Sequence, residues 1–167
     1  GDCVVAFSSG HFDGVTERIQ HHLGDPITPA RPADMEIIQG NLEQTGLGDE
    51  DTTALDEGDF LVVSDEAGIV GCVALEQYDD AGILRSLAVV PERRGRGLGW
   101  MLADCVIGRA RAAGVRRLYL LTESASDFFA AKLGFRAIDR RIVEASVAWS
   151  LHFHEAVASA VVMRLDV

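Results

Sequence analysis

The sequence of 167 residues predicts a single α/β domain built round an antiparallel meander. Three β-rich runs, at residues 60–64, 69–78 and 83–90, follow one another through the short turns DEAG and DDAG. Runs joined in this way pair as neighbouring antiparallel strands. Beyond them, segments with helical spacing alternate with further β-rich runs. A chain of this length can bury a core of its own, so we expect one domain over residues 26–167, with residues 1–25 as an N-terminal extension.

The elements outside the meander are predicted in order along the chain. Residues 27–30 form a short extended piece, and residues 31–48 form a helix that ends at Gly46 or Gly48. A second helix ends at Gly114 and carries an apolar stripe of Leu98, Met101, Leu102, Cys105 and Val106. The remainder is predicted as strands over 116–122, 135–141 and 159–167, with a short helix over 126–134.

Composition and charge exclude several classes of protein. The net charge is −11, and the single lysine, Lys132, stands against fourteen arginines, so the general basic surface of a nucleic-acid-binding protein is absent. A polyanionic ligand would have to meet a local patch. The three cysteines form no C-x-x-C pair and indicate reduced thiols. The sequence starts without a basic leader or a long apolar stretch, so we expect a cytoplasmic protein without membrane contact.

The histidines do not predict a metal site. His11, His21 and His22 lie in the extension without a cysteine or carboxylate at ligand spacing, which favours a solvated tail. His152 and His154 would share one face of a strand by alternation, but no third ligand stands at a useful spacing. We expect their segment to border a binding pocket or to cover a sheet edge.

The segment ERRGRGLGW, residues 92–100, leads from a β-rich run into the second helix and allows three interpretations. A phosphate loop of the type GxxxxGK followed by a hydroxyl is excluded, because no lysine and hydroxyl pair follows the glycines. A dinucleotide fingerprint of the type GxGxxG fails because Leu102 stands in the third glycine position. The segment PERRGR also separates the strand from the glycines, whereas a dinucleotide loop follows its strand directly.

The third interpretation is a cradle for a pyrophosphate group. Glycines at three alternating positions remove side chains from a loop that enters a helix, so backbone N–H groups and the helix dipole can face an anion. Arg93, Arg94 and Arg96 add positive charge. In a protein of net charge −11, this local patch predicts a site for coenzyme A. An ordinary helix start with solvated arginines is the structural alternative.

This loop resembles the signature of the GNAT superfamily of acyl-CoA-dependent N-acetyltransferases, which reads R/Q-x-x-G-x-G/A after a strand that ends V-x-P. Here the signature is Arg94-Gly95-Arg96-Gly97-Leu98-Gly99, behind Val89-Val90-Pro91. The sequence KLGF, from Lys132 to Phe135, is another common element of the family. Within the superfamily, the segments LEQYDDAGILRSLAVVPERRGRGLG, RRLYLLT and SAVVMRL resemble the arsenic-resistance branch that acetylates arsinothricin, a relative of the phosphinothricin acetyltransferases.

The resemblance implies a mixed, mostly antiparallel central sheet with helices on both faces and splayed central strands. It implies acetyl-CoA as the co-substrate and no metal. The backbone of Leu87, Ala88 and Val89 would pair with the pantetheine arm of the coenzyme, and the loop from Arg94 to Gly99 would hold the pyrophosphate. Trp100 would touch the adenosine end, with a contact in a homodimer or a plain core position as the alternatives.

Two expected catalytic groups of the resembling enzymes are missing. Many family members place a tyrosine before LGF, where this chain has Ala130. The phosphinothricin enzymes carry a glutamate on the strand before the glycine loop, where the aligned residue is Leu84. The best remaining carboxylate is Glu76, on the preceding strand, which we predict as the catalytic base. Tyr78 is a weaker catalytic candidate.

Arg85 and Ser86 interrupt an otherwise apolar strand, and the resemblance makes them candidates for contact with the substrate. If the hairpin turns on Asp80 and Ala81, Glu76 lies opposite Arg85, and the pair is then either structural or shared with the substrate.

The predicted function is transfer of acetyl from acetyl-CoA to the amine of a small, anionic, amino-acid-like compound such as arsinothricin or phosphinothricin. The alternatives are a coenzyme A-binding sensor without turnover and an acetyltransferase that acts on proteins.

Overall fold

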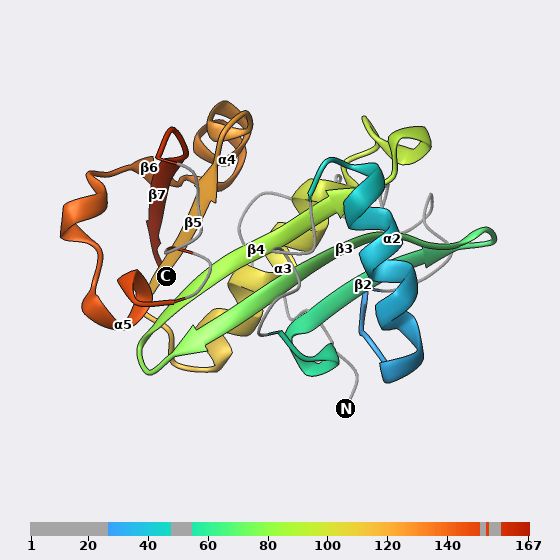
Figure 1. The fold of residues 1–167 in the computed structure, drawn as a ribbon, viewed down its shortest axis with the longest axis horizontal. Coiled ribbons are helices and arrows are strands. Elements are labelled where there is room, and N and C mark those ends of the chain that lie inside the picture. The colour runs from blue at the N-terminus through green and yellow to red at the C-terminus, as the bar shows by residue number, and fades with distance from the viewer. Residues whose placement is uncertain (1–26, 48–54, 151–152, 154–157) are drawn as a thin grey trace, which may run out of the picture.

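The computed structural model describes residues 27–47, 55–150, 153 and 158–167. Their strands form one seven-stranded sheet in the order β1-β2-β3-β4-β5-β7-β6 (Figure 1). The strands are β1 (Thr28–Pro29), β2 (Phe60–Asp65), β3 (Gly68–Tyr78), β4 (Ala81–Val89), β5 (Arg117–Thr122), β6 (Arg136–Ala137) and β7 (Val161–Asp166). Neighbouring strands are antiparallel except for the parallel pair β4 and β5, which confirms the predicted mixed sheet.

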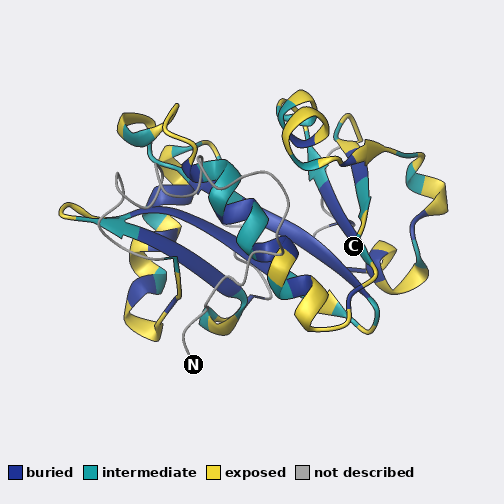
Figure 2. Ribbon diagram, turned by 180° about the vertical axis from the view of Figure 1, so that it is seen from behind, coloured by how far each residue is buried: buried dark blue, intermediate teal, exposed yellow. Residues whose placement is uncertain are grey.

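Helices cover both faces of this sheet. The α-helices are α2 (Met35–Gln44), α3 (Leu98–Ala112), α4 (Ser126–Leu133) and α5 (Ala145–Ala148). Short 3₁₀ turns are η1 (Pro32–Asp34), η3 (Glu57–Asp59), η4 (Pro91–Arg93) and η5 (Arg140–Ile142). Figure 2 shows the central strands buried and the outer sides of the helices exposed.

Alternation along the strands explains the two layers. Val73 and Leu75 of β3 pack into a cluster with α3 and α4, whereas Cys72 and Ala74 pack with α2 on the opposite face. Near the hairpin of β3 and β4, a third cluster places Val147 of α5 on the same face as α2. One face is therefore covered by α3 and α4, and the other by α2 and α5.

Glycines end two of the predicted helices where the sequence indicates. Gly46 follows the last residues of α2 with a φ of 83°, and Gly114 follows α3 with the same φ. The left-handed conformation turns the chain out of the helix, and glycine adopts it without a steric penalty. The stripe predicted for α3 is confirmed at Leu98, Leu102 and Val106, all of which are buried.

The hairpin between β3 and β4 has a different register from the predicted one. Tyr78 pairs with Ala81, so the two turn residues are Asp79 and Asp80, and Glu76 lies opposite Ile83 instead of Arg85. Asp79 has a φ of 49°. A two-residue hairpin turn requires such left-handed backbone, and aspartate tolerates it better than most residues do.

A β-bulge interrupts β4 at Ser86. Cys72 pairs with Ala88 whereas Ala74 pairs with Arg85, so two residues of β4 lie opposite one residue of β3. Ser86 has a φ of 56°, which is the left-handed region. The extra residue inverts the side-chain alternation of β4, so Leu87 faces the α3 side of the sheet.

The central strands splay apart, as the resemblance implies. The ladder between β4 and β5 comprises three pairs and ends at Ile83 and Tyr119. β5 then continues to pair with β7 as far as Thr122. The rest of β4, from Leu84 to Val89, has no ladder with β5, which leaves an opening in the middle of the sheet.

Two predicted elements are shorter in the structure than in the sequence-based prediction. The strand predicted over residues 135–141 is only the two-residue β6, because the chain turns into η5 directly afterwards. Helix α2 is shorter than the predicted residues 31–48, and η1 precedes it. The segment with His152 and His154, the N-terminal histidines and residues 1–25 lie outside the described residues.

Candidate active site

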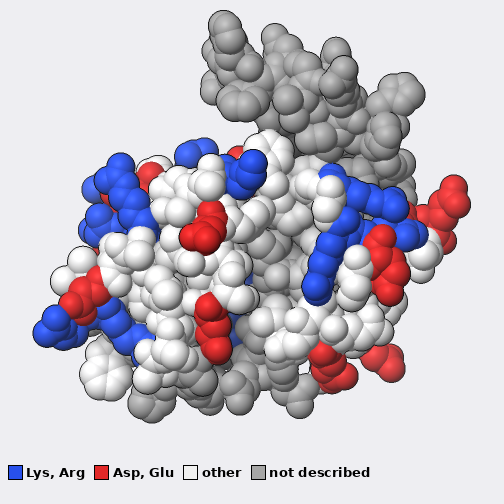
Figure 3. All heavy atoms as spheres, turned by 90° about the horizontal axis from the view of Figure 1, so that it is seen from above, with Lys and Arg blue, Asp and Glu red and all other residues white. Residues whose placement is uncertain are grey.

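A cleft of about 910 Å³ opens between the splayed part of β4, the glycine loop and α4. Positively charged side chains gather over the loop between β4 and α3, and the surface from this loop towards α4 is mostly uncharged (Figure 3). The lining residues are Leu87, Val89, Arg93, Arg94, Gly95, Gly97, Leu98, Gly99, Trp100, Ala125, Phe128, Ala131 and Lys132.

The loop presents backbone groups at the start of α3. Gly95 and Gly97 have φ values of 75° and 86°, and Gly97 is the N-cap of α3. A Cβ atom built on either glycine would meet no atom within 4 Å, so the requirement for glycine comes from the backbone conformation. The first amides of a helix have no partner within it, so they are available to an anion here.

Val89 adds polar backbone to the same cleft. The N–H of Val90 donates to the carbonyl of Val70 at 3.0 Å, so the neighbouring Val89 turns its N–H and C=O away from β3. Arg94 Nε donates to this Val89 carbonyl at 2.9 Å. An elongated ligand that pairs with β4 would meet the Arg94 side chain at this carbonyl, which has two lone pairs and can accept from both.

Arg93, which also lines the cleft, is paired with an acidic residue. Its Nε lies 2.5 Å from Oδ2 of Asp65, at the end of β2. The hydrogen bond from Arg93 and one from the backbone of Ala67 lower the pKa of the Asp65 carboxyl. Arg93 therefore has a carboxylate partner, whereas Arg94 contacts only a carbonyl among the described residues.

Most of the residues predicted to bind coenzyme A line this cleft, and two do not. Ala88 is buried among the residues that pack against α2, since it lies opposite Cys72 in the ladder. Arg96 is exposed outside the cleft lining. Conversely, Phe128 and Lys132 of α4 line the cleft but were not predicted to do so. Their i, i+4 spacing in a helix that follows a strand could have indicated that they share one side of that helix.

Three of the four predicted catalytic and substrate-contact residues, Glu76, Tyr78 and Arg85, meet on the opposite face of the sheet, whereas the fourth, Ser86, is buried in the bulge of β4. Arg85 Nη1 donates to Glu76 Oε2 at 2.8 Å, and Tyr78 Oη donates to Glu76 Oε1. The Arg85 side chain is 1% exposed and that of Glu76 is 12% exposed. The contact forms diagonally, because Arg85 is two residues beyond Ile83, the direct partner of Glu76.

Tyr78 remains a neutral phenol over the ordinary pH range. Burial, followed by the hydrogen bond to the Glu76 carboxylate, raises the pKa of Tyr78 to about 12. A hydrogen bond with the buried Ser150 opposes this shift. Ser150 Oγ also accepts the backbone N–H of Phe153 at 3.3 Å, so Phe153 is joined to the cluster.

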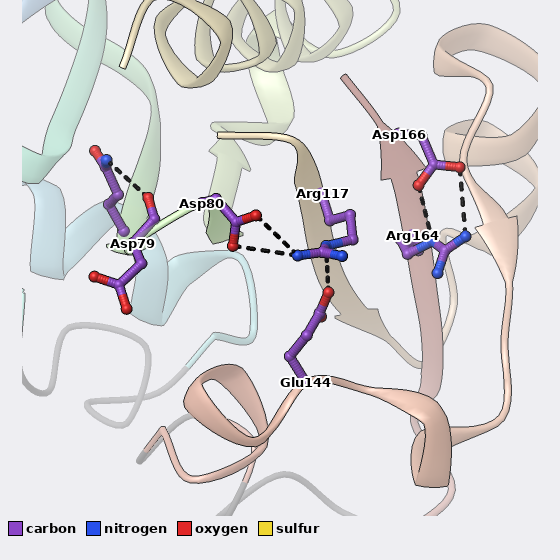
Figure 4. Close-up of polar contacts among 7 residues, drawn as sticks. Asp79, Asp80, Arg117, Glu144, Arg164 and Asp166 are labelled. Carbon is purple, nitrogen blue, oxygen red and sulfur yellow. Dashed lines mark hydrogen bonds and ion pairs between the residues drawn. The ribbon is translucent and has the colours of Figure 1, made fainter. Parts of the chain in front are cut away.

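An ion-pair network fixes α5 over this face (Figure 4). Arg117, the first residue of β5, contacts Asp80 of the hairpin turn at 3.0 Å and also pairs with Glu144. Glu144 is the N-cap of α5. The same carboxylate lies next to Tyr119, whose pKa is raised to about 12, first by burial and then by Glu144. The hairpin, β5 and α5 are thereby held together beside Glu76.

The opening between β4 and β5 connects the two faces of the sheet. Arg85 and Ser86 stand just past the end of the β4–β5 ladder. The cleft lies on the α3 side of the opening, and the Glu76–Arg85 pair lies on the α2 side. A reactive group at the end of a ligand in the cleft can therefore meet an acceptor held on the other face.

The model of the acetyltransferase (GNAT) family matches residues 20–135. The chain belongs to the GNAT family. Among curated relatives of this GNAT chain, the amino-acid acetyltransferase of Ralstonia nicotianae is 38% identical over 82 residues, which are 48% of this chain and 18% of the relative. The amino-acid acetyltransferase of Mannheimia succiniciproducens is 28% identical over 133 residues, 74% of this chain and 30% of the relative. The chain therefore spans less than a third of these relatives.

Solved structures show the same GNAT fold. An N-acetylglutamate synthase of Neisseria gonorrhoeae, complexed with coenzyme A and N-acetyl-glutamate, superposes with a TM-score of 0.72 at 22% identity, covering 84% of this chain and 34% of that one. A Mycobacterium tuberculosis protein in complex with CoA gives a TM-score of 0.71 at 22% identity, covering 86% and 99%. In the described part of this GNAT chain, no helix has the length and apolar character needed to cross a membrane.

Proposed function

We propose that this GNAT chain transfers acetyl from acetyl-CoA to the α-amine of an amino acid that carries a second acidic group. One observation carries the proposal: a cleft with exposed helix and strand amides meets a buried arginine–glutamate pair through the opening beside β4. The relatives named as amino-acid acetyltransferases, and the neighbour complexed with N-acetyl-glutamate, support this acceptor class.

The residues of the cleft fit coenzyme A. Gly95 and Gly97 keep the loop free of side chains at the first amides of α3, where a diphosphate would accept hydrogen bonds. The outward backbone groups of Val89 suit the amides of a pantetheine arm. Leu87 and Phe128 add apolar side chains to the lining of the same cleft. Acetyl-CoA supplies an activated thioester, whose carbonyl carbon is open to attack by an amine.

Glu76 and Arg85 would act on the acceptor. An α-ammonium group must lose a proton before it attacks, and Glu76 is the carboxylate beside the opening that can accept it. A carboxylate has about four lone-pair positions, so Glu76 can still accept a proton while it holds Tyr78 and Arg85. Attack forms the amide bond, the carbon–sulfur bond breaks, and the departing thiolate takes up a proton.

Arg85 would also select an acidic acceptor. Its guanidinium offers five N–H donors in a planar fork, which matches a carboxylate or phosphinate-like oxyanion. Glutamate, phosphinothricin and arsinothricin share this plan of an α-amino acid with a second oxyanionic group. We include arsinothricin and phosphinothricin as the finer candidates, on the basis of the sequence resemblance.

The test is the release of free thiol from acetyl-CoA across a panel of amines. Glutamate, glutamine, arsinothricin, phosphinothricin, spermidine, an aminoglycoside and a lysine-containing peptide would be compared at equal concentration. The proposal expects the highest kcat/KM with an amino acid that carries a second acidic group. Binding of acetyl-CoA without thiol release with any amine would instead identify a coenzyme A-binding module without turnover, and preference for the peptide would identify a protein acetyltransferase.

A further inference from the structure

Lys132, in the last turn of α4, lines the same cleft as the glycine loop. It is the single lysine in a chain with 26 acidic residues. Its side chain is exposed, and among the described residues it has no hydrogen bond or ion pair. The net charge is −11, yet no carboxylate among the described residues forms an ion pair with this cation.

The spacing on α4 aims Lys132 at the cleft. Ala125, the N-cap of the helix, and Phe128, Ala131 and Lys132 recur three to four residues apart and all line the cleft. Residues at this spacing share one side of a helix. Three of the four are apolar, so this side of α4 offers a hydrophobic surface with one positive charge near its C-terminal end.

The two cationic sides of the cleft suit two separate anions. On one side, Arg94 and the amides at the start of α3 form one compact anion site. Lys132 approaches from a different helix. Coenzyme A carries a diphosphate and, on its ribose, a separate phosphomonoester with a charge near −2. A compact ammonium group is well suited to a phosphomonoester, to which it binds as a point charge.

We propose that Lys132 binds the ribose phosphomonoester of coenzyme A and so selects coenzyme A over its dephospho form. The inference rests on the proposed function, because it assigns one more group of the same ligand. Trp100 lines the same cleft from the first turn of α3 and offers a flat apolar surface to the adenine base.

The experiment is calorimetry with coenzyme A and with dephospho-coenzyme A, on the wild-type chain and on Lys132→Gln. We expect the wild type to bind coenzyme A about ten-fold or more tightly than the dephospho form, as one charge-assisted hydrogen bond provides. Lys132→Gln should lose most of this ratio and keep its affinity for the dephospho form. The ratio should also shrink with added salt, because the lysine is exposed.

Arg111→Gln is the matched control, since Arg111 is an exposed cation in the last turn of α3 and does not line the cleft. It should leave both affinities unchanged. An equal loss of both affinities in Lys132→Gln, or a wild type that does not distinguish the two ligands, overturns the assignment of Lys132. If the wild type binds neither ligand, the coenzyme A site itself is refuted, and the proposed function fails with it.

Discussion

Glu76 is held from two directions by hydrogen bonds that reach different oxygens of its carboxylate. Tyr78 donates to Oε1 from the same strand, and Arg85 donates to Oε2 from the neighbouring strand. Two donors fix the plane of the carboxylate, so its remaining lone pairs keep a constant direction. A base with a fixed orientation can meet an acceptor amine without first reorganising.

Glu76→Gln should reduce the rate of acetyl transfer most strongly near neutral pH. The amide cannot accept the ammonium proton, but an amine with a pKa of about 9 to 10 deprotonates unaided as the pH rises. The rate of the variant should therefore recover in alkaline solution when kcat/KM is measured against pH. An equal loss at every pH would indicate a structural role for Glu76.

Tyr78 and Tyr119 are the two tyrosines of the chain, and both have pKa values raised to about 12. Absorbance of the phenolate should therefore appear near pH 12 in the folded protein and near pH 10 after unfolding in denaturant. Because the folded pKa values lie above the unfolded ones, the stabilisation is present below pH 10 and is lost as the pH rises to 12. The free energy of unfolding should fall across this window, and a folded-state titration near pH 10 would contradict the burial of both phenols.

The Glu76–Arg85 pair also shows what residue patterns can predict. The two charges in neighbouring β-rich runs predict a contact, and the contact exists. The predicted register is wrong, because it depends on which two residues form the turn, and a sequence with DDAG offers more than one choice. The two side chains still meet in the observed register, because long side chains also reach diagonal neighbours in a sheet.

At the scale of elements, the passage from β4 through the loop into α3 builds the cleft. The strand, the glycines and the helix are all recognisable in the sequence because each has a local signature. The bulge at Ser86 has no such signature, since a serine with left-handed backbone is held by the surrounding sheet. Without the bulge, Leu87 would face the α2 side and the cleft would lose part of its lining.

Gly97→Val should weaken acetyl-CoA binding by at least ten-fold and leave the fold intact. Valine at a φ of 86° is strained, so the loop must change its path, and the added side chain stands where the diphosphate approaches. Calorimetry measures the affinity, and circular dichroism checks the fold.

Gly108→Ala is the control on the same helix. Gly108 lies in the interior of α3 on an exposed position, and an added Cβ meets no atom within 4 Å. This change should stabilise the protein by up to about 1 kcal/mol and leave the affinity unchanged. Unchanged affinity in Gly97→Val would remove the cradle from the proposed site.

At the scale of the whole molecule, net charge and local charge favour opposite acceptors. A net charge of −11 attracts cations at long range, whereas Arg85 in the proposed role would attract an anion at the site itself. At ordinary ionic strength, screening acts over about 8 to 10 Å, so the nearby arginine should dominate.

Arg85→Ala should raise the KM for an acidic amino acid by one to two orders of magnitude, which corresponds to about 1.5 to 3 kcal/mol for a charged hydrogen bond. Arg85→Lys keeps the charge without the planar fork, so its KM should lie between those of the wild type and Arg85→Ala. Arg31→Ala removes an exposed guanidinium that pairs with the buried Asp34 before α2, and it should leave KM unchanged. Faster acetylation of spermidine or of an aminoglycoside than of any acidic amino acid would restrict Arg85 to its pairing with Glu76.

The short ladder between β4 and β5 divides the sheet into two parts, which are joined by three residue pairs. A ligand bound across the open part would add hydrogen bonds between the two parts of the sheet. These bonds would slow the local opening that exposes the chain to proteases. Ligand at a hundred times its dissociation constant adds about 2.7 kcal/mol to the folded state. The lifetime of the protein in a cell would then follow the supply of acetyl-CoA, and its abundance would report the metabolic state as well as the rate of synthesis.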